Sequence, residues 1–193
     1  MPAAKKYKRD EVLDRAIALF RRQGYSATST AELADGLGMN RKSMYAEFGS
    51  KQALFEAALE RYSDVYLTRV LAPIEAEGAN ARSIRDAFEG YASASETPFR
   101  GLGCLMANTA VERAALDEGS ARYVDAYLER LLRGFRRALE VAREAGEVPD
   151  GADLDDLAAH FANAVVGISA LLRAKATPEM MYAASRGIVS VLD

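Results

Sequence analysis

Apolar residues recur at spacings of three and four along most of the chain, and no stretch alternates between apolar and polar with a period of two. Such spacing is typical of amphipathic helices that pack one face on a core. In residues 9–23 it predicts a first helix, which Gly24 ends as a C-terminal cap. The apolar face of this helix comprises Val12, Leu13, Ala16, Ile17 and Phe20.

Capping residues then mark three more helices. Ser29 and Glu32 form a capping box ahead of a short helix with apolar positions at 33, 34 and 37, which a glycine ends in a tight turn. Asn40 caps a third helix, from 41 to about 47, whose inward residues are at 44 and 48. Ser50 caps a fourth helix, expected to run from 51 to about 70 and to stop before Pro73.

Five further helices follow, separated by turns too short to be domain linkers. Thr177 and Pro178 are a good helix start, an N-cap followed by proline at the first helical position. The sequence thus predicts an all-α fold of about nine helices, in which a three-helix head continues through the fourth helix into a larger C-terminal bundle. We place the two domains at 1–55 and 56–193. The later helices are expected at 83–95, 103–117, 121–145, 154–175 and 178–192.

Composition narrows the class of protein. Half of the 193 residues are hydrophobic and about a quarter are charged, as in ordinary globular domains. Cys104 is the only cysteine and cannot form an internal disulfide, and no apolar run near the N-terminus resembles a signal peptide. The most apolar stretch, 157–172, is shorter than the ~20 residues that cross a bilayer. We therefore expect a cytoplasmic protein with no membrane partner.

Charge is divided unevenly along the chain. The net charge is −3, yet residues 1–55 carry +4 and the remainder carries −7. A basic N-terminal third joined to an acidic remainder indicates an anionic partner, such as nucleic acid, that is engaged by one end only.

The second and third helices, with the glycine turn between them, form a helix-turn-helix, whose second helix can enter the major groove of DNA. Arg41 and Lys42 open that helix, where an exposed cation is disfavoured by about 0.3–1 kcal/mol unless an anion lies opposite. Lys51 opens the fourth helix, where its ammonium and free backbone N–H groups can hold a phosphate. The alternative is that these cations are simply solvated. The expected DNA contacts are Thr28, Ser29, Thr30, Asn40, Arg41, Lys42, Ser43, Tyr45 and Lys51.

The run GYSATSTAELADGLGMNRKSMYAEFGSKQALFEAAL, within residues 9–58, resembles the DNA-binding head of the TetR family of bacterial transcriptional regulators. The resemblance implies a homodimer, a repressor by analogy, that binds an inverted-repeat operator and is released by a small-molecule or electrophile signal. It places Arg41, Lys42, Ser43 and Tyr45 on the recognition helix. One departure is Glu47, which at a groove would repel phosphate or accept from a cytosine amine.

The helix expected at 154–175 is apolar nearly all round, since eleven of the fifteen residues 158–172 are apolar. A helix of this kind is buried on every side. We expect it to pair, together with the last helix, with the same helices of a second protomer; the alternative is ordinary core within one chain. The expected dimer contacts are Phe161, Ala162, Val165, Ser169, Leu172, Met181, Ala184, Ile188 and Val191.

A ligand pocket is expected in the C-terminal bundle, lined mainly by apolar residues. Cys104 is expected in the first turn of a helix with Arg100 close in sequence, a setting that favours thiolate. The segment is similar to a branch of the TetR family in which such a cysteine senses electrophiles; the alternative is a small buried side chain. The expected lining residues are Tyr62, Tyr66, Phe88, Tyr91, Leu102, Cys104, Leu105, Asn108, Phe135, Phe161 and Val165.

Two other classes of function compete. An enzyme is disfavoured because His160 is the only histidine, and the sequence contains no metal-ligand spacing, nucleophile elbow or phosphate loop. We expect no metal and no cofactor. A helical interaction module that never binds DNA would explain the all-α pattern but not the uneven charge.

Overall fold

The computed structural model describes residues 7–113 and 115–193, and within these ranges every regular element is helical. A π-helical segment, Tyr62–Leu67, joins α4 to α5 without a break, so the described residues form nine helical rods and the prediction of an all-α fold is confirmed. Two 3-10 turns, Ala94–Glu96 and Ser190–Leu192, complete the described elements. The helices are α1 Arg9–Gln23, α2 Thr30–Leu37, α3 Arg41–Phe48, α4 Lys51–Arg61, α5 Thr68–Glu75, α6 Ala81–Ser93, α7 Leu105–Glu112, α8 Glu118–Glu144, α9 Leu154–Arg173 and α10 Pro178–Val189.

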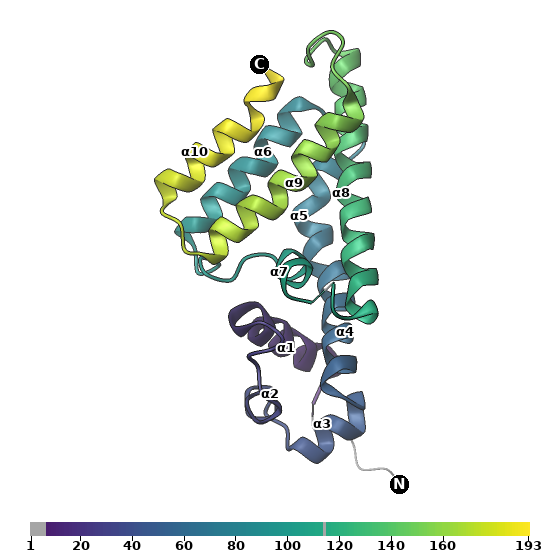
Figure 1. The fold of residues 1–193 in the computed structure, drawn as a ribbon, viewed down its shortest axis with the longest axis vertical. Helices are drawn as coiled ribbons and strands as arrows, with labels where there is room; N and C mark the ends of the chain where they lie inside the picture. The colour runs from purple at the N-terminus through teal and green to yellow at the C-terminus, as the bar shows by residue number, and fades with distance from the viewer. Residues whose placement is uncertain (1–6, 114) are drawn as a thin grey trace.

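The head consists of α1, α2 and α3 and lies at one end of the molecule, below α7 in Figure 1. The expected apolar residues of α1 are all buried, and the helix packs against α2 and α4. Its bounds and its C-cap at Gly24 are those predicted. A patterned helix with a glycine just past its last turn leaves few alternatives for where it ends.

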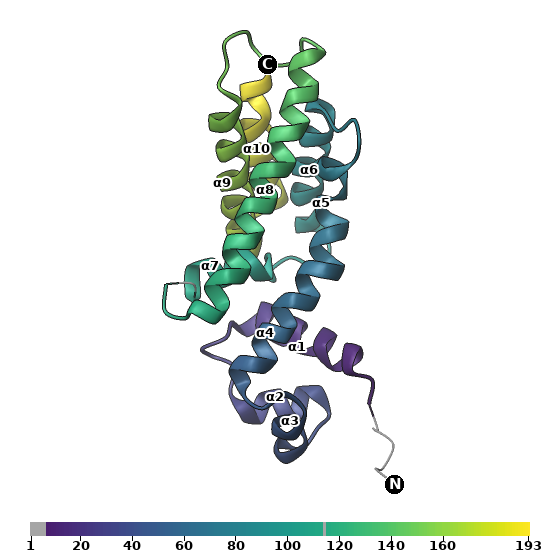
Figure 2. The same cartoon turned by 90° about the vertical axis from the view of Figure 1, so that its right-hand side faces the viewer.

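The rod made of α4, the π segment and α5 connects head and body, and Figure 2 shows it running from the head into the bundle beside α6 and α8. The prediction that this helix stops before Pro73 is wrong, because Pro73 lies within α5. Proline deprives the carbonyl four residues earlier of its donor. Both Arg69 and Pro73 are exposed, so solvent can satisfy that carbonyl and the helix continues to Glu75.

The body packs α6, α9 and α10 side by side, with α5 and the 27-residue α8 crossing next to them (Figure 1). Three phenylalanines from different helices meet at its centre: Phe88, Phe135 and Phe161, with ring centroids 5.4 to 6.0 Å apart. Such aromatic clusters bury large areas and fix how the helices cross. No helix among the described residues is long and apolar enough to span a membrane.

The helix expected at 103–117 is shorter in the structure. Gly103 has a φ of +64° and Cys104 is extended, so α7 begins at Leu105 and Cys104 is its N-cap residue. The helix ends at Glu112, and Asp117 then caps α8 by accepting a hydrogen bond from the Ser120 N–H at 2.7 Å.

Candidate DNA-binding face, ligand cavity and dimer face

The turn between α2 and α3 is built from local hydrogen bonds. The predicted capping box is present: the Ser29 N–H donates to the Glu32 carboxylate at 2.8 Å, and the Glu32 N–H donates to Ser29 Oγ at 3.2 Å. Gly38 takes a left-handed conformation, with φ +65°, at the end of α2. Arg15 of α1 donates to the Leu37 carbonyl at 3.1 Å and so ties this end of α2 to the first helix.

Helix α3 presents cations outward. The Asn40 side chain caps it by accepting from the Ser43 N–H at 2.8 Å, and Met44 and Phe48 are buried beneath it. Arg41 and Lys42 are exposed, and no ion pair joins either to another residue within the described ranges. The Tyr45 side chain is 40% exposed on the same helix.

Glu47 does not face the exposed side of α3. Its side chain is 9% exposed and accepts hydrogen bonds from the Tyr7 hydroxyl at 3.0 Å and from Arg9 Nη1 at 2.8 Å. Arg9 also lies over the Phe48 ring, 4.8 Å from its centroid. The role considered for Glu47 at a DNA groove therefore does not apply, because the start of α1 binds its carboxylate.

The three hydroxyl residues before α2 differ in exposure. Thr28 is fully buried and its hydroxyl donates to the Gly24 carbonyl at 2.5 Å, so the expectation that it offers a hydroxyl to phosphate is wrong. Ser29 is exposed and Thr30 is half-buried. Of the three hydroxyl residues, only Thr28 is buried.

Lys51 is held against the head rather than free in solvent. Its Nζ lies 4.2 Å from the centroid of the Tyr25 ring, and the guanidinium carbon of Arg113 lies 4.2 Å from the same centroid. Burial lowers the pKa of Lys51 and the charge of Arg113 adds to this, while Glu112 and Glu32 act in the opposite direction. Two cations therefore lie against one ring here, and Arg113 is also 3.6 Å from the Asp117 carboxylate.

A carboxylate of the body holds the turn after α1. Glu112, the last residue of α7, accepts from the Tyr25 N–H at 3.0 Å and from the Ser26 N–H at 2.6 Å. A Cβ at Gly24 would lie 2.7 Å from the Glu112 carboxylate, and Gly24 has a φ of +88°, so glycine is required at this approach. Burial acts to raise the pKa of Glu112, but the donors from Ser26 and Tyr25 outweigh it and the pKa is lowered.

A cavity of about 320 Å³ lies between the α4–α5 rod, α6, the segment 97–104 and α9. Four of the expected lining residues, Tyr62, Tyr66, Tyr91 and Cys104, are on its wall. The structure contradicts the other expected positions. Leu102 and Asn108 lie away from it and bond to each other, with Asn108 Nδ2 donating to the Leu102 carbonyl at 3.0 Å. The remaining ones, buried in the packed core instead, are Phe88, Leu105, Phe135, Phe161 and Val165.

The head contributes to this cavity, which the sequence did not predict. Arg21 of α1 is on the wall, where its Nε and Nη2 donate to the Gly103 carbonyl at 3.0 and 2.6 Å. Its guanidinium carbon lies 5.7 Å from the Tyr62 ring centroid and 5.6 Å from that of Phe99. A cation in the last turn of a helix gives no sequence signal for such a role, because it is equally expected as a partner of the helix dipole.

A second contact runs from the cavity to α1. The Tyr66 hydroxyl donates to Asp14 Oδ1 at 3.3 Å, and Arg61 binds the same carboxylate through two nitrogens at 2.7 and 2.9 Å. The hydrogen bond from Arg61 is the main cause of the lowered pKa of Asp14, with Arg61's charge and Tyr66 contributing.

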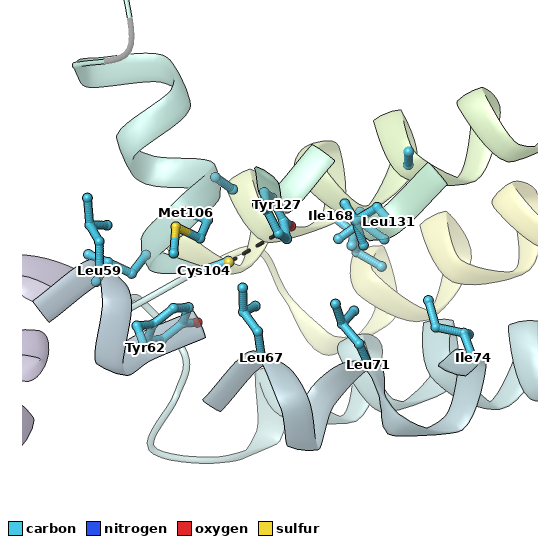
Figure 3. Close-up of a cluster of buried hydrophobic side chains, with 14 of the residues drawn as sticks. Leu59, Tyr62, Leu67, Leu71, Ile74, Cys104, Met106, Tyr127, Leu131 and Ile168 are labelled. Carbon is cyan, nitrogen blue, oxygen red and sulfur yellow. Dashed lines mark hydrogen bonds between the residues drawn. The ribbon is translucent and has the colours of Figure 1, made fainter. Parts of the chain in front are cut away.

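Cys104 is buried between the α4–α5 rod, which carries Tyr62, and α8, which carries Tyr127 (Figure 3). Its Sγ lies 3.9 Å from the Tyr127 hydroxyl, and the side chains of Tyr62 and Met106 lie next to it. Burial raises the pKa of Tyr127, and the nearby Cys104 adds to this. The expected neighbour Arg100 points elsewhere, because its Nη2 donates to the Lys175 carbonyl at 2.7 Å.

Most expected dimer residues face the interior of a single protomer. Six of them are buried there, and Ala184 and Ile188 are half-buried, so for the buried six the expectation is wrong. The inward face of α9 holds its large side chains together with Ala162 and Ser169, a choice that an all-round apolar pattern does not reveal. The six buried residues are Phe161, Ala162, Val165, Ser169, Leu172 and Met181.

The outward face of α9 and α10, which we call the small-residue face, consists of Ala159, Asn163, Gly167, Ala170, Ala183, Gly187 and Val191. A Cβ added at Gly167 or Gly187 would meet no atom within 4 Å in the protomer. Behind this face, His160 Nε2 lies 3.0 Å from the Ile188 carbonyl and links the two helices.

The chain matches two family models. Residues 12–58 match the bacterial regulatory proteins of the tetR family, and residues 81–188 match the tetracyclin repressor-like C-terminal domain. The second match alone spans more than half of the chain.

Two curated relatives are similar over most of their length. The uncharacterized HTH-type transcriptional regulator YezE of Bacillus subtilis (strain 168) is 35% identical over 144 residues, which are 75% of this chain and 74% of the relative. The HTH-type transcriptional repressor ComR of Escherichia coli (strain K12) is 32% identical over 183 residues, which are 92% of this chain and 85% of the relative.

Solved structures share the fold. A cysteine mutant of the TetR family transcriptional regulator CifR, complexed with 26bp double-strand operator DNA, has a TM-score of 0.84 at 22% identity and covers 96% of this chain and 97% of its own. A TetR transcriptional regulator from Rhodococcus sp. RHA1 has a TM-score of 0.59 at 30% identity and covers 94% of this chain and 97% of its own. The head with its helix-turn-helix, the bundle and the relatives agree: this chain belongs to the tetR family of bacterial regulatory proteins and is a DNA-binding transcriptional regulator.

Proposed function

We propose that the chain is a repressor that binds an inverted-repeat operator as a homodimer, with α3 of each protomer in one major groove. The observation that carries this proposal is the exposed pair Arg41 and Lys42, which has no ionic partner among the described residues. Opposite DNA, Arg41 can address the O6 and N7 atoms of guanine, while Tyr45 and Ser43 lie within the same helix. Half-sites would then lie about 34–36 Å apart, or a multiple of this distance.

Phosphate contacts are assigned to the residues at the helix starts. Ser29 and Thr30 lie at the N-terminus of α2 and Asn40 at that of α3, and anions bind well at helix N-termini. Lys51 opens α4 beside them. We assign the DNA-binding domain to 1–55 and the ligand and dimer domain to 56–193, and we place the protein in the bacterial cytoplasm because its partner is chromosomal DNA.

The small-residue face is assigned to the dimer interface. Glycine and alanine let two helices approach closely, and Val191, expected in the interface from the sequence, is exposed there. Ala184 and Ile188 are half-buried at the edge of this face and would be covered by a second protomer. Pairing of α9 and α10 with their symmetry mates would bring the two heads to the same side of the dimer.

Ligand response is assigned to the cavity because α1 forms part of its wall. A molecule that pushes Arg21 away from the Gly103 carbonyl, or Tyr66 away from Asp14, changes how α1 sits on the body. The two heads would then change separation, and a ligand that prefers this arrangement lowers operator affinity by its differential affinity for the two states.

Cys104 gives a second candidate signal, an electrophile that reacts with its thiol. Its place on the cavity wall supports the idea, and its burial supports plain packing instead. Treating the dimer with a quinone distinguishes them: loss of operator binding in the native chain but not in Cys104→Ser supports sensing, and equal behaviour of both excludes it.

The experiment for the main proposal is a selection of bound duplexes from random DNA, followed by a salt titration of the selected sequence. We expect an inverted repeat, and an affinity that falls steeply as salt rises because phosphate contacts release counterions. A dimer that binds no duplex of any sequence in dilute buffer would contradict the proposal and favour an interaction module.

A further inference from the structure

The wall of the cavity contains a buried hydroxyl without a partner. Ser169 of α9 is 1% exposed, and its Oγ makes no hydrogen bond to any described residue. Serine in a helix usually bonds the carbonyl one turn back or faces solvent. Ser169 does neither, and a polar group left unsatisfied in this way costs free energy that a bound acceptor would recover.

Other donors lie on the same wall. The Tyr91 hydroxyl forms no hydrogen bond within the described residues, and burial raises the pKa of this hydroxyl, so it stays protonated at neutral pH. Arg21 adds guanidinium N–H groups. Three kinds of donor therefore surround the cavity: an aliphatic hydroxyl, a phenol and a guanidinium.

Two acceptors on the wall, the Gly103 carbonyl and the Asp86 carboxylate, already have a cation beside them. The Gly103 carbonyl receives two hydrogen bonds from Arg21. The Asp86 carboxylate is largely exposed and lies 3.8 Å from Arg82 Nε. A ligand with hydrogen-bond donors would therefore meet few acceptors, whereas a ligand with an acceptor oxygen could accept a hydrogen bond from the Ser169 hydroxyl.

The rest of the wall selects against charge. Tyr62, Phe99 and Leu172 supply apolar surface, and the guanidinium of Arg21 is already stacked on two of these rings and bonded to Gly103. Arg21 is the cation on this wall and has no carboxylate partner among the described residues, but while it stays bonded to Gly103 it offers only its remaining N–H groups, which repay the lost hydration of a ligand carboxylate in part.

Resting on the proposed ligand response, we propose that the effector is an uncharged, ring-bearing molecule whose carbonyl oxygen accepts a hydrogen bond from Ser169. Its rings pack on Tyr62 and Phe99. The Tyr91 hydroxyl donates to the same oxygen or to a second one.

Three probes of matched shape test this class: benzophenone, diphenylmethane, which lacks the carbonyl, and diphenylacetate, which carries a charge. Their affinities for the full chain are measured by calorimetry for the native protein, Ser169→Ala and Tyr91→Phe. In the native protein benzophenone is expected to bind most tightly. Its advantage over diphenylmethane is expected to fall about three- to tenfold in Ser169→Ala, the loss of one neutral hydrogen bond.

Ser185→Ala is the matched control, since Ser185 is also buried but lies in α10 and is not on the cavity wall. It should leave the ratio of benzophenone to diphenylmethane affinity unchanged. Ser169→Ala should also unfold at a temperature equal to or higher than the native chain, because it removes the unsatisfied hydroxyl.

Three results would overturn the inference: a ratio that is the same in the native chain and in Ser169→Ala, tightest binding of diphenylacetate, or no binding of benzophenone. Operator binding without any probe is measured on the same samples. Its loss would reject the proposed function by a separate readout, while the affinity ratio would still decide the role of Ser169.

Discussion

Two exposed surfaces of this molecule, the outer side of α3 and the small-residue face, differ in chemistry. Helix α3 exposes Arg41 and Lys42 beside Tyr45, whereas the small-residue face of α9 and α10 exposes alanine, glycine and valine. The first surface suits a partner of opposite charge that acts at a distance and is weakened by salt. The second suits close packing against a shape like itself, which depends on contact and little on salt.

The head and its junction with the body hold their functional residues in place in two different ways. In the head, short-range caps and turns fix each side chain, as with Asn40 and Ser43. At the junction with the body, residues far apart in sequence do so, as with Glu112 and Tyr25 or Arg21 and Gly103. Substitutions can test whether α3 acts through its charge and the small-residue face through packing.

The largest effect is expected from Gly167→Glu on the small-residue face. A side chain there meets nothing in the protomer, so the chain should fold, but a charge would be buried between two copies. Loss of the dimer removes the linkage of two half-sites, so operator affinity should fall about 10²–10⁴-fold. Light scattering and fluorescence anisotropy with operator DNA measure both changes.

Ala126→Glu, on the exposed side of α8, is the control for that charge. It should leave mass and operator affinity unchanged. A Gly167→Glu protein that remains dimeric would contradict the assignment of the interface.

Next in size is Arg41→Ala on α3. It should cost about 1–3 kcal/mol of operator binding per half-site and relax the preference for one base pair, because a base-edge contact is lost. Lys51→Ala should instead weaken all sequences alike and make the salt dependence shallower. Binding titrations against the selected operator and single-base variants check this, and equal behaviour of the two variants would contradict the division into base and phosphate contacts.

Glu112→Gln should act on the junction rather than on DNA. The neutral amide accepts more weakly, so amide exchange at Tyr25 and Ser26 should speed up about tenfold, equivalent to about 1.4 kcal/mol. Hydrogen exchange with residue resolution measures it. Operator affinity should change less than in Arg41→Ala.

The pH dependence of stability gives a second readout for Glu112. Because the folded pKa of Glu112 lies below its ordinary value of 4.5, the carboxylate stabilises the fold above that pH. This stabilisation should disappear as the pH falls below about 4.5 and through the folded pKa, and the matching part of the pH profile should be absent in Glu112→Gln. Identical pH profiles for the native chain and Glu112→Gln would mean that the hydrogen bonds from Tyr25 and Ser26 to Glu112 contribute nothing to stability.

The smallest effect on DNA binding is expected from Thr28→Val. The hydroxyl is buried and bonded to Gly24, so operator affinity should not change, while the free energy of unfolding should fall by about 1 kcal/mol. Chemical denaturation and anisotropy measure the two quantities. A lower operator affinity at unchanged stability would mean that the hydroxyl does reach a phosphate.

The sequence predicted the head better than the body because its signals are local. Ser29 with Glu32 and Asn40 with Ser43 are caps within three residues of one another, and the structure has both. The contacts of Glu47 were not predicted because its partners, Tyr7 and Arg9, lie about forty residues away in the chain. A helical pattern alone does not tell which neighbouring helix will offer a donor.

In the body, the helices were predicted but their facing was not. Phe161 and Val165 were assigned to the outside because α9 is apolar all round, and packing turned them inward while Gly167 and Ala170 faced out. For the same reason only four of the eleven expected lining residues are on the cavity wall. Tyr62 and Tyr66 lie on it, whereas Arg21 reaches it from a helix of the head that no periodicity connects with the body.

The π segment between α4 and α5 holds a spare residue in the rod that joins the head to the body. A π turn accommodates an extra residue compared with a regular α-helix, and each residue of an α-helix turns it by about 100°. Because the wide turn takes up that extra residue, deleting one residue from Tyr62–Leu67 should give an unbroken α-helix in which α4 and α5 keep their relative facing. Deleting one residue from the regular part of α4 should instead rotate the head by about 100° relative to the bundle, because no spare residue is present there.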